Sequence, residues 1–408
     1  MKILFIATDI PYPINSGGRN RLYHIVKGLS RFNEVDFVGL SNTRDPFSAK
    51  EELSRYCRAV YAIPVDIRHS VIKLIKSFFS KTPYKVLQYF STTMAEKIRA
   101  LIKENSYDII LCEHIFVEQH IPSVSIPVVP QNIDLNYTVY KRIAEKSKGF
   151  MSWYSASQWK SLYRYEQKVL QKYNVGIALS SHEEKLMKSM VRDIHSIIVP
   201  NGVDTTYFRS AQNSSNSGEN NIIFTGSYSY FPNEEAAYYF ATKIFPAVVS
   251  KIPDAKYFII GRSPSARLLN LQKRQNIIVT GEVEDIRSYL DKAQVVVAPI
   301  QFGGGTRLKV LEALAAAKAI VSTSIGCEGI DIENGKHLII ADNENSFAEA
   351  VISFLLDPQK NISFGRQGRL LIEKKYSWER ITADFQESLK NYIEEYSRLS
   401  GRVNENRN

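Results

Sequence analysis

The feature that most constrains the fold of this chain is a repeated alternation of short apolar runs and longer amphipathic stretches. In the first half, the apolar runs cover residues 3–7, 35–40, 59–63, 109–112, 128–129 and 176–180. In the second half, they cover residues 222–225, 257–260, 277–280, 295–298, 319–322 and 338–340. Short runs that are apolar throughout are typical of strands buried on both faces, and strand–helix alternation produces right-handed βαβ units. The sequence therefore predicts the α/β class, with helices on both faces of parallel sheets.

The length of the chain and a polar break in its middle predict two domains. A chain of 408 residues exceeds what one hydrophobic core usually supports. A turn at 199–202 and a polar segment at 213–221 separate the two sets of apolar runs. We therefore predict two doubly wound, Rossmann-like domains at residues 1–205 and 206–380. Residues 381–408 are predicted to form a last helix that returns to the first domain, with a disordered tail from residue 401.

The composition argues against several other classes of protein. Apolar residues make up 44% of the chain and charged residues 23%, which is ordinary for a globular protein. The three cysteines are odd in number and far apart in sequence, which argues against a disulfide framework or a cysteine metal site. The chain opens into a predicted strand without the layout of a signal peptide, and no apolar run reaches membrane-spanning length. These features predict a cytoplasmic protein.

The net charge of +10 is confined to the first half of the chain. Residues 1–200 hold 28 Lys and Arg against 18 Asp and Glu, whereas residues 201–408 hold 24 of each. Residues 67–95 contain no acid, and their basic residues alternate with large apolar ones. This pattern favours a basic amphipathic helix over residues 68–90 that lies on an anionic membrane, and the alternative is a core-packing helix with an exposed lysine face. No DNA- or RNA-binding motif occurs, so no nucleic-acid partner is predicted.

A glycine-rich loop in the second half predicts an anion site. Residues 302–312, Phe-Gly-Gly-Gly-Thr-Arg-Leu-Lys-Val-Leu-Glu, join the apolar run 295–298 to a predicted helix at 307–318. Glycines let backbone N–H groups approach an anion, and a helix N-terminus adds free N–H groups and a positive dipole end. Arg307 and Lys309 add two cations, and Glu312 lies about one turn further, where it can accept hydrogen bonds from sugar hydroxyls. The arrangement favours a nucleoside diphosphate, and the alternative is a glycine-rich turn that only caps a helix.

A second loop of the same kind follows the first predicted strand. Within residues 11–21, Gly17 and Gly18 open a predicted helix, and Arg19 and Arg21 lie beside them. Ligands of open parallel sheets bind beyond the carboxyl ends of the strands. We therefore expect the two glycine-and-arginine loops to face one cleft between the domains.

These loops and four further segments carry a resemblance to a known family. The segments are Ser-Gly-Gly-Arg at 16–19, Pro-Asn-Gly-Val-Asp at 200–204, Phe-Thr-Gly-Ser at 224–227, Gly-Gly-Gly-Thr-Arg-Leu-Lys-Val-Leu-Glu-Ala at 303–313, Ser-Ile-Gly-Cys-Glu-Gly at 324–329 and Tyr-Ser-Trp at 376–378. In this order and spacing, the chain resembles a glycosyltransferase of the GT-B fold, in the retaining GT4-type group, over nearly its whole length. The resemblance implies transfer of a sugar from a nucleoside-diphosphate sugar to a glycan or a lipid-linked saccharide in cell-envelope or polysaccharide biosynthesis.

The resemblance also implies which residues bind each substrate. The first domain would bind the acceptor and the second domain the donor. The implied donor-binding residues are Gly17, Gly18, Arg19, Gly226, Glu282, Val283, Gly304, Gly305, Thr306, Arg307, Leu308, Lys309 and Glu312. Among them, Arg307 and Lys309 would hold the diphosphate, Glu312 the ribose hydroxyls, and the backbone near Glu282 the base. The candidates for acceptor contacts are Gln131, Asn132 and Asp134.

The chain departs from the family pattern at three places. Of the family's two spaced glutamates only the second, Glu312, is present, and Gly304 holds the first position. The Arg and Lys that often follow the first strand of the second domain are missing from residues 226–231, and Arg307 and Lys309 are expected to supply their charge. Gln131 stands where relatives often have a histidine, and an amide cannot move a proton.

An acid–base role is therefore expected elsewhere in the first domain. Glu113 and His114 follow the apolar run 109–112, and they are our candidates for catalytic residues together with Arg307 and Lys309. Their alternative interpretation is a helix cap and a surface histidine. In a retaining front-face reaction, the leaving phosphate could itself deprotonate the acceptor.

No metal and no cofactor are expected, since no Asp-x-Asp pair is evident and side chains would take the place of the ion. Two other functions were weighed. A sugar-nucleotide epimerase of the same fold would need carboxylates placed to take a proton from the sugar, and no such arrangement is evident. A non-catalytic scaffold that binds nucleotide sugars or a partner transferase stays open, because fold analogy does not decide between them.

Overall fold

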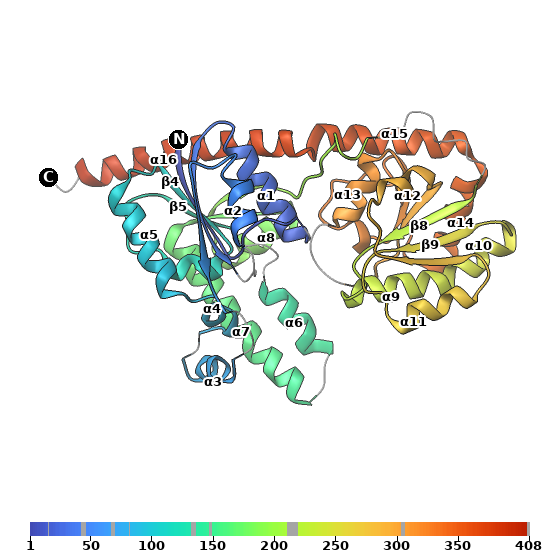
Figure 1. The fold of residues 1–408 in the computed structure, drawn as a ribbon, viewed down its shortest axis with the longest axis horizontal. Coiled ribbons are helices and arrows are strands. Elements are labelled where there is room, and N and C mark those ends of the chain that lie inside the picture. The colour runs from blue at the N-terminus through green and yellow to red at the C-terminus, as the bar shows by residue number, and fades with distance from the viewer. Residues whose placement is uncertain are drawn as a thin grey trace. The chain divides into compact units, whose positions relative to one another are not determined.

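The computed structural model describes residues 1–405 except 15, 42–45, 67–69, 81, 132–135, 147–148, 210–218 and 303–306. Its contacts divide the chain into two compact units (Figure 1). Unit 1 comprises Met1–Pro200 and Ile381–Asn408, and unit 2 comprises Asn201–Arg380. The C-terminal segment therefore belongs to the same unit as the N-terminal half.

Unit 1 is built on a parallel sheet of seven strands. The strands are β1 (Lys2–Ala7), β2 (Glu34–Ser41), β3 (Ala59–Pro64), β4 (Ile109–Glu113), β5 (Val128–Gln131), β6 (Val175–Ala178) and β7 (His195–Ile198). Their order is β3-β2-β1-β4-β5-β6-β7, so the chain proceeds outward from β1 in one direction and from β4 in the other. The carboxyl ends of β1 and β4 flank this switch point, which is where open parallel sheets bind ligands.

The helices of unit 1 cover the sheet and form a projecting hairpin. They are α1 (Gly17–Leu29), α2 (Pro46–Leu53), α3 (Val71–Ser80), α4 (Tyr84–Gln88), α5 (Thr92–Glu104), the short 3-10 helix η1 (Ile115–His120), α6 (Asn136–Lys146), α7 (Gly149–Tyr173), α8 (Ser181–Met190) and α16 (Trp378–Glu405). Serine side chains cap several of their N-termini, as Ser16 does for α1, Ser91 for α5 and Ser180 for α8. Figure 1 shows α6 and α7 as a helical hairpin at one end of the unit.

Helix α16 docks on unit 1 through a closely fitted contact with α1. Its apolar side Ile381, Phe385, Leu389 and Tyr392 is buried. Gly28 of α1 faces Thr382 so closely that a Cβ at this glycine would collide with the threonine side chain. Asn33, just beyond α1, donates a hydrogen bond of 2.5 Å from Nδ2 to Oε1 of Gln386.

Unit 2 repeats the architecture with a parallel sheet of six strands. The strands are β8 (Asn221–Thr225), β9 (Lys256–Ile260), β10 (Ile277–Gly281), β11 (Val295–Ala298), β12 (Ala319–Ser322) and β13 (Ile339–Ile340). Their order is β10-β9-β8-β11-β12-β13, with the switch between β8 and β11. The two parallel sheets confirm the predicted class of doubly wound α/β domains.

Alternate residues of these strands enter two separate cores, one on each face of the sheet. Ile222 and Phe224 pack into one core, and Ile223 packs into the other. The helices are α9 (Phe231–Tyr239), the π-helical turn η2 (Phe240–Ile244), α10 (Phe245–Lys251), α11 (Ala266–Leu269), the 3-10 turn η3 (Asn270–Lys273), α12 (Arg287–Lys292), α13 (Leu308–Ala315), the 3-10 turn η4 (Ile325–Cys327), α14 (Glu344–Leu356) and α15 (Pro358–Lys375). Burial on both faces explains why these strands are apolar throughout instead of alternating with polar residues.

Three details of the predicted elements were wrong. Strand β7 is not among the predicted strands, because this edge strand has only four residues and is only partly buried. The helix predicted at 307–318 is shorter, since α13 spans Leu308–Ala315 and Arg307 precedes it as the N-cap. The tail was predicted to be disordered from residue 401, but α16 continues to Glu405.

The basic stretch 68–90 does not form one helix. It contains α3 and α4, and the two are joined to each other because Ser70 N–H donates to the Tyr84 hydroxyl and Lys73 Nζ donates to the Gln88 carbonyl. The outward face of α3 carries Ile72, Ile75 and Phe79, which are 68%, 52% and 86% exposed. The alternative interpretation is wrong for these three side chains, which point outward instead of packing on a core, whereas its exposed lysine is present as Lys76.

None of the helices within the described residues is both long and apolar enough to cross a membrane.

We predict that Gly28→Ala destabilises unit 1 whereas Gly18→Ala does not. The new methyl group at position 28 collides with Thr382 of α16, and such overpacking costs about 1–3 kcal/mol of unfolding free energy. At position 18, in the same helix, a Cβ meets no atom within 4 Å, so alanine there is neutral or stabilises the helix. Thermal or denaturant unfolding of the two variants measures the difference. Equal unfolding midpoints for both variants would contradict the docking of α16 on α1.

Candidate functional site

Three loops of unit 2 lie at the carboxyl edge of its sheet and contain the predicted donor-site residues. Gly226 follows β8, Glu282 and Val283 follow β10, and Arg307 follows the loop after β11. Arg307 is the N-cap residue of α13 and only 9% exposed, and Leu308 begins the helix and packs partly against the core. Gly304, Gly305 and Thr306 lie outside the described residues, so the glycine cradle is described only through its flanking residues.

Lys309 connects two of these loops through Asn233, the third residue of α9. Lys309 Nζ donates a hydrogen bond of 2.8 Å to Asn233 Oδ1, and Asn233 Nδ2 donates one of 2.9 Å to the Ser227 carbonyl. The ammonium also lies 4.1 Å from the centroid of the Phe224 ring. A Cβ on Gly226 would come within 3.0 Å of Lys309 Nζ, so glycine leaves room for the lysine. The sequence did not indicate Asn233.

The enclosure of this site shifts the pKa values of two neighbouring side chains toward neutrality. Burial lowers the pKa of Lys309 to about 7, and the positive charge of Arg307 acts in the same direction. Burial raises the pKa of Glu312 to about 7, against the attraction of Lys309. A cationic site that is partly discharged when empty regains its charge when an anion enters, because the anion favours the protonated lysine.

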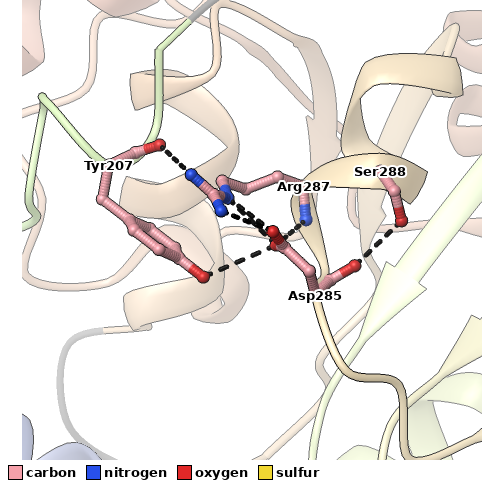
Figure 2. Close-up of polar contacts among 4 residues, drawn as sticks. All are labelled: Tyr207, Asp285, Arg287 and Ser288. Carbon is pink, nitrogen blue, oxygen red and sulfur yellow. Dashed lines mark hydrogen bonds and ion pairs between the residues drawn. The ribbon is translucent and has the colours of Figure 1, made fainter.

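The loop after β10 is held by a compact cluster that the sequence analysis missed (Figure 2). Asp285 accepts hydrogen bonds from the Arg287 backbone N–H at 2.9 Å and from its Nε and Nη2 at 2.9 and 2.5 Å. The Arg287 guanidinium stacks 3.9 Å from the centroid of the Tyr207 ring, and the Tyr207 hydroxyl reaches Asp285 at 3.5 Å. Ser288 Oγ donates to the Asp285 carbonyl. The cluster therefore fixes the residues directly after Glu282 and Val283.

Unit 1 contains a cavity of about 320 Å³ at the carboxyl ends of β1 and β4. Its lining includes four of the residues predicted from the sequence, namely Gly18, Arg19, Glu113 and His114, with Thr8, Asp9, Ser16, Leu22, Val65 and Tyr89. Gly17 begins α1 beside it. Residues from the first glycine loop and from the end of β4 thus share one cavity, which their sequence separation alone did not establish.

Arg19 enters the cavity wall as part of an ion pair. Its Nε donates to Asp9 Oδ2 at 2.6 Å and its Nη2 donates to Asp9 Oδ1 at 3.0 Å. This partner largely compensates the charge that the sequence suggested for an anion site.

The helix-cap part of the alternative interpretation applies to His114, which is the half-buried N-cap residue of η1 and makes no side-chain capping hydrogen bond. Glu113 is the last residue of β4 and 6% exposed, and burial raises its pKa to about 7 against a hydrogen bond from Thr8. His114 has a φ of +76° and stacks on Phe116 with ring centroids 4.0 Å apart. Burial and the nearby Lys85 charge lower the pKa of His114 to about 3, so this imidazole is neutral at pH 7. The carboxyl group is the one of the pair that titrates near neutrality.

Gln131 is directed into unit 1 instead of presenting a free amide. With its amide oxygen toward Arg21, it accepts hydrogen bonds from Nε at 2.8 Å and from Nη2 at 2.9 Å. Arg21 also donates to the carbonyls of Val199 and Pro200, both at 2.7 Å. Arg21 is therefore a structural residue that joins β5 to the segment after β7. Asn132 and Asp134 lie outside the described residues.

Among the residues that the structure describes, no group of three or more His, Cys, Asp or Glu is arranged to hold a metal ion.

Comparison with known proteins identifies the domain that carries the Lys309 site. Residues 219–357 match the model of the family described as glycosyl transferases group 1. This segment is therefore similar to glycosyl transferases group 1. It covers most of unit 2, including β8, α9 and α13.

Two relatives extend the comparison beyond this domain. A protein of Klebsiella pneumoniae, described as an uncharacterized 44.6 kDa protein in the cps region, is 25% identical over 378 residues, which are 89% of this chain and 92% of that protein. A GDP-mannose-dependent monoacylated alpha-(1-6)-phosphatidylinositol monomannoside mannosyltransferase of Corynebacterium glutamicum is 26% identical over 149 residues, 34% of this chain and 39% of that protein.

Solved structures share the fold at low sequence identity. Sucrose-phosphate synthase of Thermosynechococcus elongatus superposes with a TM-score of 0.71 at 14% identity, over 96% of this chain and 99% of the other. Anabaena HepE in complex with UDP superposes with a TM-score of 0.67 at 13% identity, over 96% of this chain and 100% of the other. WaaG, a glycosyltransferase involved in lipopolysaccharide biosynthesis, superposes with a TM-score of 0.63 at 15% identity, over 94% of this chain and 99% of the other. These likenesses confirm the predicted GT-B fold and, with the matched domain, support a glycosyltransferase.

We predict that binding of a nucleoside diphosphate weakens as the pH rises above about 7. Lys309 has a pKa of about 7 in the free protein, and a bound diphosphate raises it, so binding above this pH takes up a proton. Ionisation of Glu312 in the same range adds a negative charge and acts in the same direction. Calorimetric titration with UDP and with GDP between about pH 6 and 9 measures the affinity. Repeating the titration in buffers of different ionisation enthalpy gives the number of protons taken up when the nucleotide binds.

The matched variant for this prediction is Lys309→Arg, which keeps a cation that does not titrate. Its proton uptake on binding is expected to fall, leaving only the contribution of Glu312. An affinity for UDP and GDP that is independent of pH in the unmodified protein would contradict the assignment.

Proposed function

We propose that the chain is a retaining glycosyltransferase that moves a sugar from a nucleoside-diphosphate sugar to a glycan or lipid-linked saccharide. Unit 2 binds the donor and unit 1 the acceptor. The observation that carries the proposal is the cation site of Arg307 and Lys309, at the start of α13 and next to the loop after β8, within the segment similar to glycosyl transferases group 1. Glycine-flanked helix N-termini with adjacent cations suit a diphosphate.

The main catalytic contribution would come from stabilising the leaving group. As the bond between the anomeric carbon and the phosphate oxygen breaks, negative charge develops on the nucleoside diphosphate. Arg307 and Lys309 are positioned by α13 and by Asn233, so they need little rearrangement to receive that charge. Fixed charges aimed at a developing charge are usually the largest electrostatic contribution to catalysis. We propose that these side chains act without a metal ion.

The acceptor proton has a short route in a front-face reaction. The acceptor oxygen forms its bond to the anomeric carbon on the face that the phosphate leaves, and its proton passes to the leaving phosphate oxygen. Glu113 and His114, which line the cavity of unit 1, would orient the acceptor hydroxyl. The Glu113 carboxyl, with its pKa near 7, could accept a hydrogen bond or the proton itself.

The relatives support an acceptor in the cell envelope. The name of the Klebsiella relative places it in the cps region. The name of the Corynebacterium relative states that it acts on a phosphatidylinositol mannoside. HepE binds UDP, whereas the Corynebacterium enzyme depends on GDP-mannose, so both bases are candidates for the donor.

We predict that one nucleoside diphosphate raises the melting temperature of the protein and that Arg307→Ala abolishes the shift. A ligand that binds the native state stabilises it by mass action, by about 2.7 kcal/mol at one hundred times the dissociation constant. The measurement is a thermal-shift panel of UDP, GDP, ADP, CMP and dTDP with their common sugar conjugates. Lys318→Met is the control, because Lys318 is a partly buried lysine of unit 2 that donates to the Asp291 carbonyl.

Two outcomes would change the proposal, one in this panel and one in an assay of donor hydrolysis and transfer. If no nucleotide shifts the melting temperature, the donor site is absent. If one nucleotide binds tightly but its sugar conjugate is neither hydrolysed nor transferred, the chain is a non-catalytic sugar-nucleotide scaffold.

We also propose that the protein is cytoplasmic and associates with an anionic membrane surface through α3. Its exposed apolar residues recur at positions 72, 75 and 79, which form one face of a helix, and Lys76 lies at the edge of that face. Residues 67–95 contain no acid. Apolar insertion combined with attraction to anionic lipid is the usual basis of interfacial helix binding.

We predict that the protein co-sediments with vesicles of mixed anionic and neutral phospholipid and less with neutral vesicles. Phe79→Ser should weaken this binding by about tenfold or more, because burying a phenylalanine contributes about 1.5–3 kcal/mol. Lys76→Glu should weaken binding to the anionic vesicles alone. The control is Phe47→Ser on α2, where the side chain is 75% exposed. Equal binding to both vesicle types, or to neither, would refute the proposal.

A further inference from the structure

Two phenylalanines of unit 2 form an aromatic pair, of which Phe231 is exposed and Phe302 is half-buried. Phe231 is the first residue of α9 and is 60% exposed, and Phe302 follows β11. Their ring centroids lie 5.5 Å apart and the ring planes are inclined by 35°. An exposed aromatic residue is ordinary by itself, but two rings in contact at the edge of a ligand site present a continuous apolar surface.

The pair is attached to the same elements that hold the two cations. Phe231 lies two residues before Asn233, which accepts the hydrogen bond from Lys309. Phe302 lies five residues before Arg307, the N-cap of α13. The two rings are therefore carried by the segments that lead into α9 and α13, the two helices joined by the hydrogen bond from Lys309 to Asn233.

The loop that carries Phe231 is fixed in position. The Tyr228 hydroxyl lies 3.2 Å from the carbonyls of both Phe224 and Ile260, and Asn233 Nδ2 donates to the Ser227 carbonyl. Pro232 follows Phe231 at the first turn of α9. A ring on a rigid loop loses little conformational freedom when a ligand stacks on it.

The strand order distinguishes this pair from the nucleoside end of the site. The order is β10-β9-β8-β11, and the predicted base contacts at Glu282 and Val283 follow β10. Adjacent strands are about 4.8 Å apart, so the carboxyl ends of β10 and β11 are about 14 Å apart. A nucleoside-diphosphate sugar that lies along this edge would have its base near β10, its diphosphate near β8 and Lys309, and its sugar toward β11.

We propose that Phe231 and Phe302 form a stacking platform for the pyranosyl group of the donor, which rests on the proposed donor site of unit 2. The faces of aromatic rings carry partial negative charge, and the C–H bonds on one face of a pyranose carry partial positive charge. The platform supplies contact area and orientation to the sugar, while Lys309 and Arg307 bind the diphosphate. The pair is thus a specificity-determining surface, and it selects sugars with an uninterrupted face of C–H bonds.

The experiment compares each nucleoside diphosphate with its own sugar conjugate. Dissociation constants are measured for UDP and UDP-glucose and for GDP and GDP-mannose, on the unmodified protein and on Phe231→Ala and Phe302→Ala. We expect the sugar conjugate to lose about three- to tenfold in affinity in both variants, while the free nucleoside diphosphate changes less than twofold. Phe231→Tyr keeps a ring and should keep the affinity for the conjugate.

The controls separate this inference from the proposed function. Leu356→Ala removes an apolar side chain of unit 2 that is 69% exposed, and it should change neither affinity. If the unmodified protein binds neither these four nucleotides nor any other nucleotide of the thermal-shift panel, the donor site itself is wrong. If nucleotides bind but both alanine variants lose UDP or GDP as strongly as the conjugate, or lose neither, the sugar platform is wrong.

Discussion

The hydrogen bond from Lys309 to Asn233 is the interaction on which the site of unit 2 depends. It joins the first turn of α13 to the first turn of α9, and Asn233 in turn holds the loop after β8 through the Ser227 carbonyl. The ammonium is enclosed against Phe224, so it exchanges hydration for a few fixed partners and its pKa falls. The amide of Asn233 holds the lysine without neutralising its charge, whereas a carboxylate would form an ion pair with it. The lysine is thus positioned by the fold and still available to an anion.

The two units treat their charged groups in opposite ways. In unit 1, Arg19 is compensated by Asp9 and Arg21 is engaged with Gln131 and the backbone, so these arginines mainly shape the cavity wall. The carboxyl group of Glu113 in the same cavity has a pKa of about 7. In unit 2, the ammonium of Lys309 is held by the neutral amide of Asn233. Such a division suits a neutral, hydroxyl-bearing ligand in unit 1 and an anionic one in unit 2.

The sequence was sufficient to predict the sheets but not the partners of the site residues. Strands buried on both faces leave continuous apolar runs, so they could be located, whereas β7 is a half-exposed edge strand and left no such signal. The cations at 307 and 309 could be assigned to the start of a helix because the loop and the helix N-terminus are adjacent in sequence, whereas the glycines before them lie outside the described residues. Only the tertiary fold brings Asn233 to Lys309, Asp9 to Arg19 and Tyr207 to Arg287. The partners in each pair are not related by the spacing of a helix or a strand, so the sequence pattern did not indicate these contacts. For the basic stretch that contains α3, the sequence allowed the apolar face to point outward or into a core, and the fold shows that Ile72, Ile75 and Phe79 point outward.

The docking of α16 on α1 has a consequence for how the protein is made. Unit 1 is discontinuous in sequence, since its second segment begins at Ile381, whereas unit 2 is one continuous stretch between the two parts. On the ribosome, unit 2 has all its strands before the side chains of Ile381, Phe385 and Leu389 exist to cover the surface around Gly28. The first unit to emerge is therefore the last to be completed. Until then, the nascent protein carries an uncovered apolar face that is vulnerable to aggregation and is a natural target for chaperones.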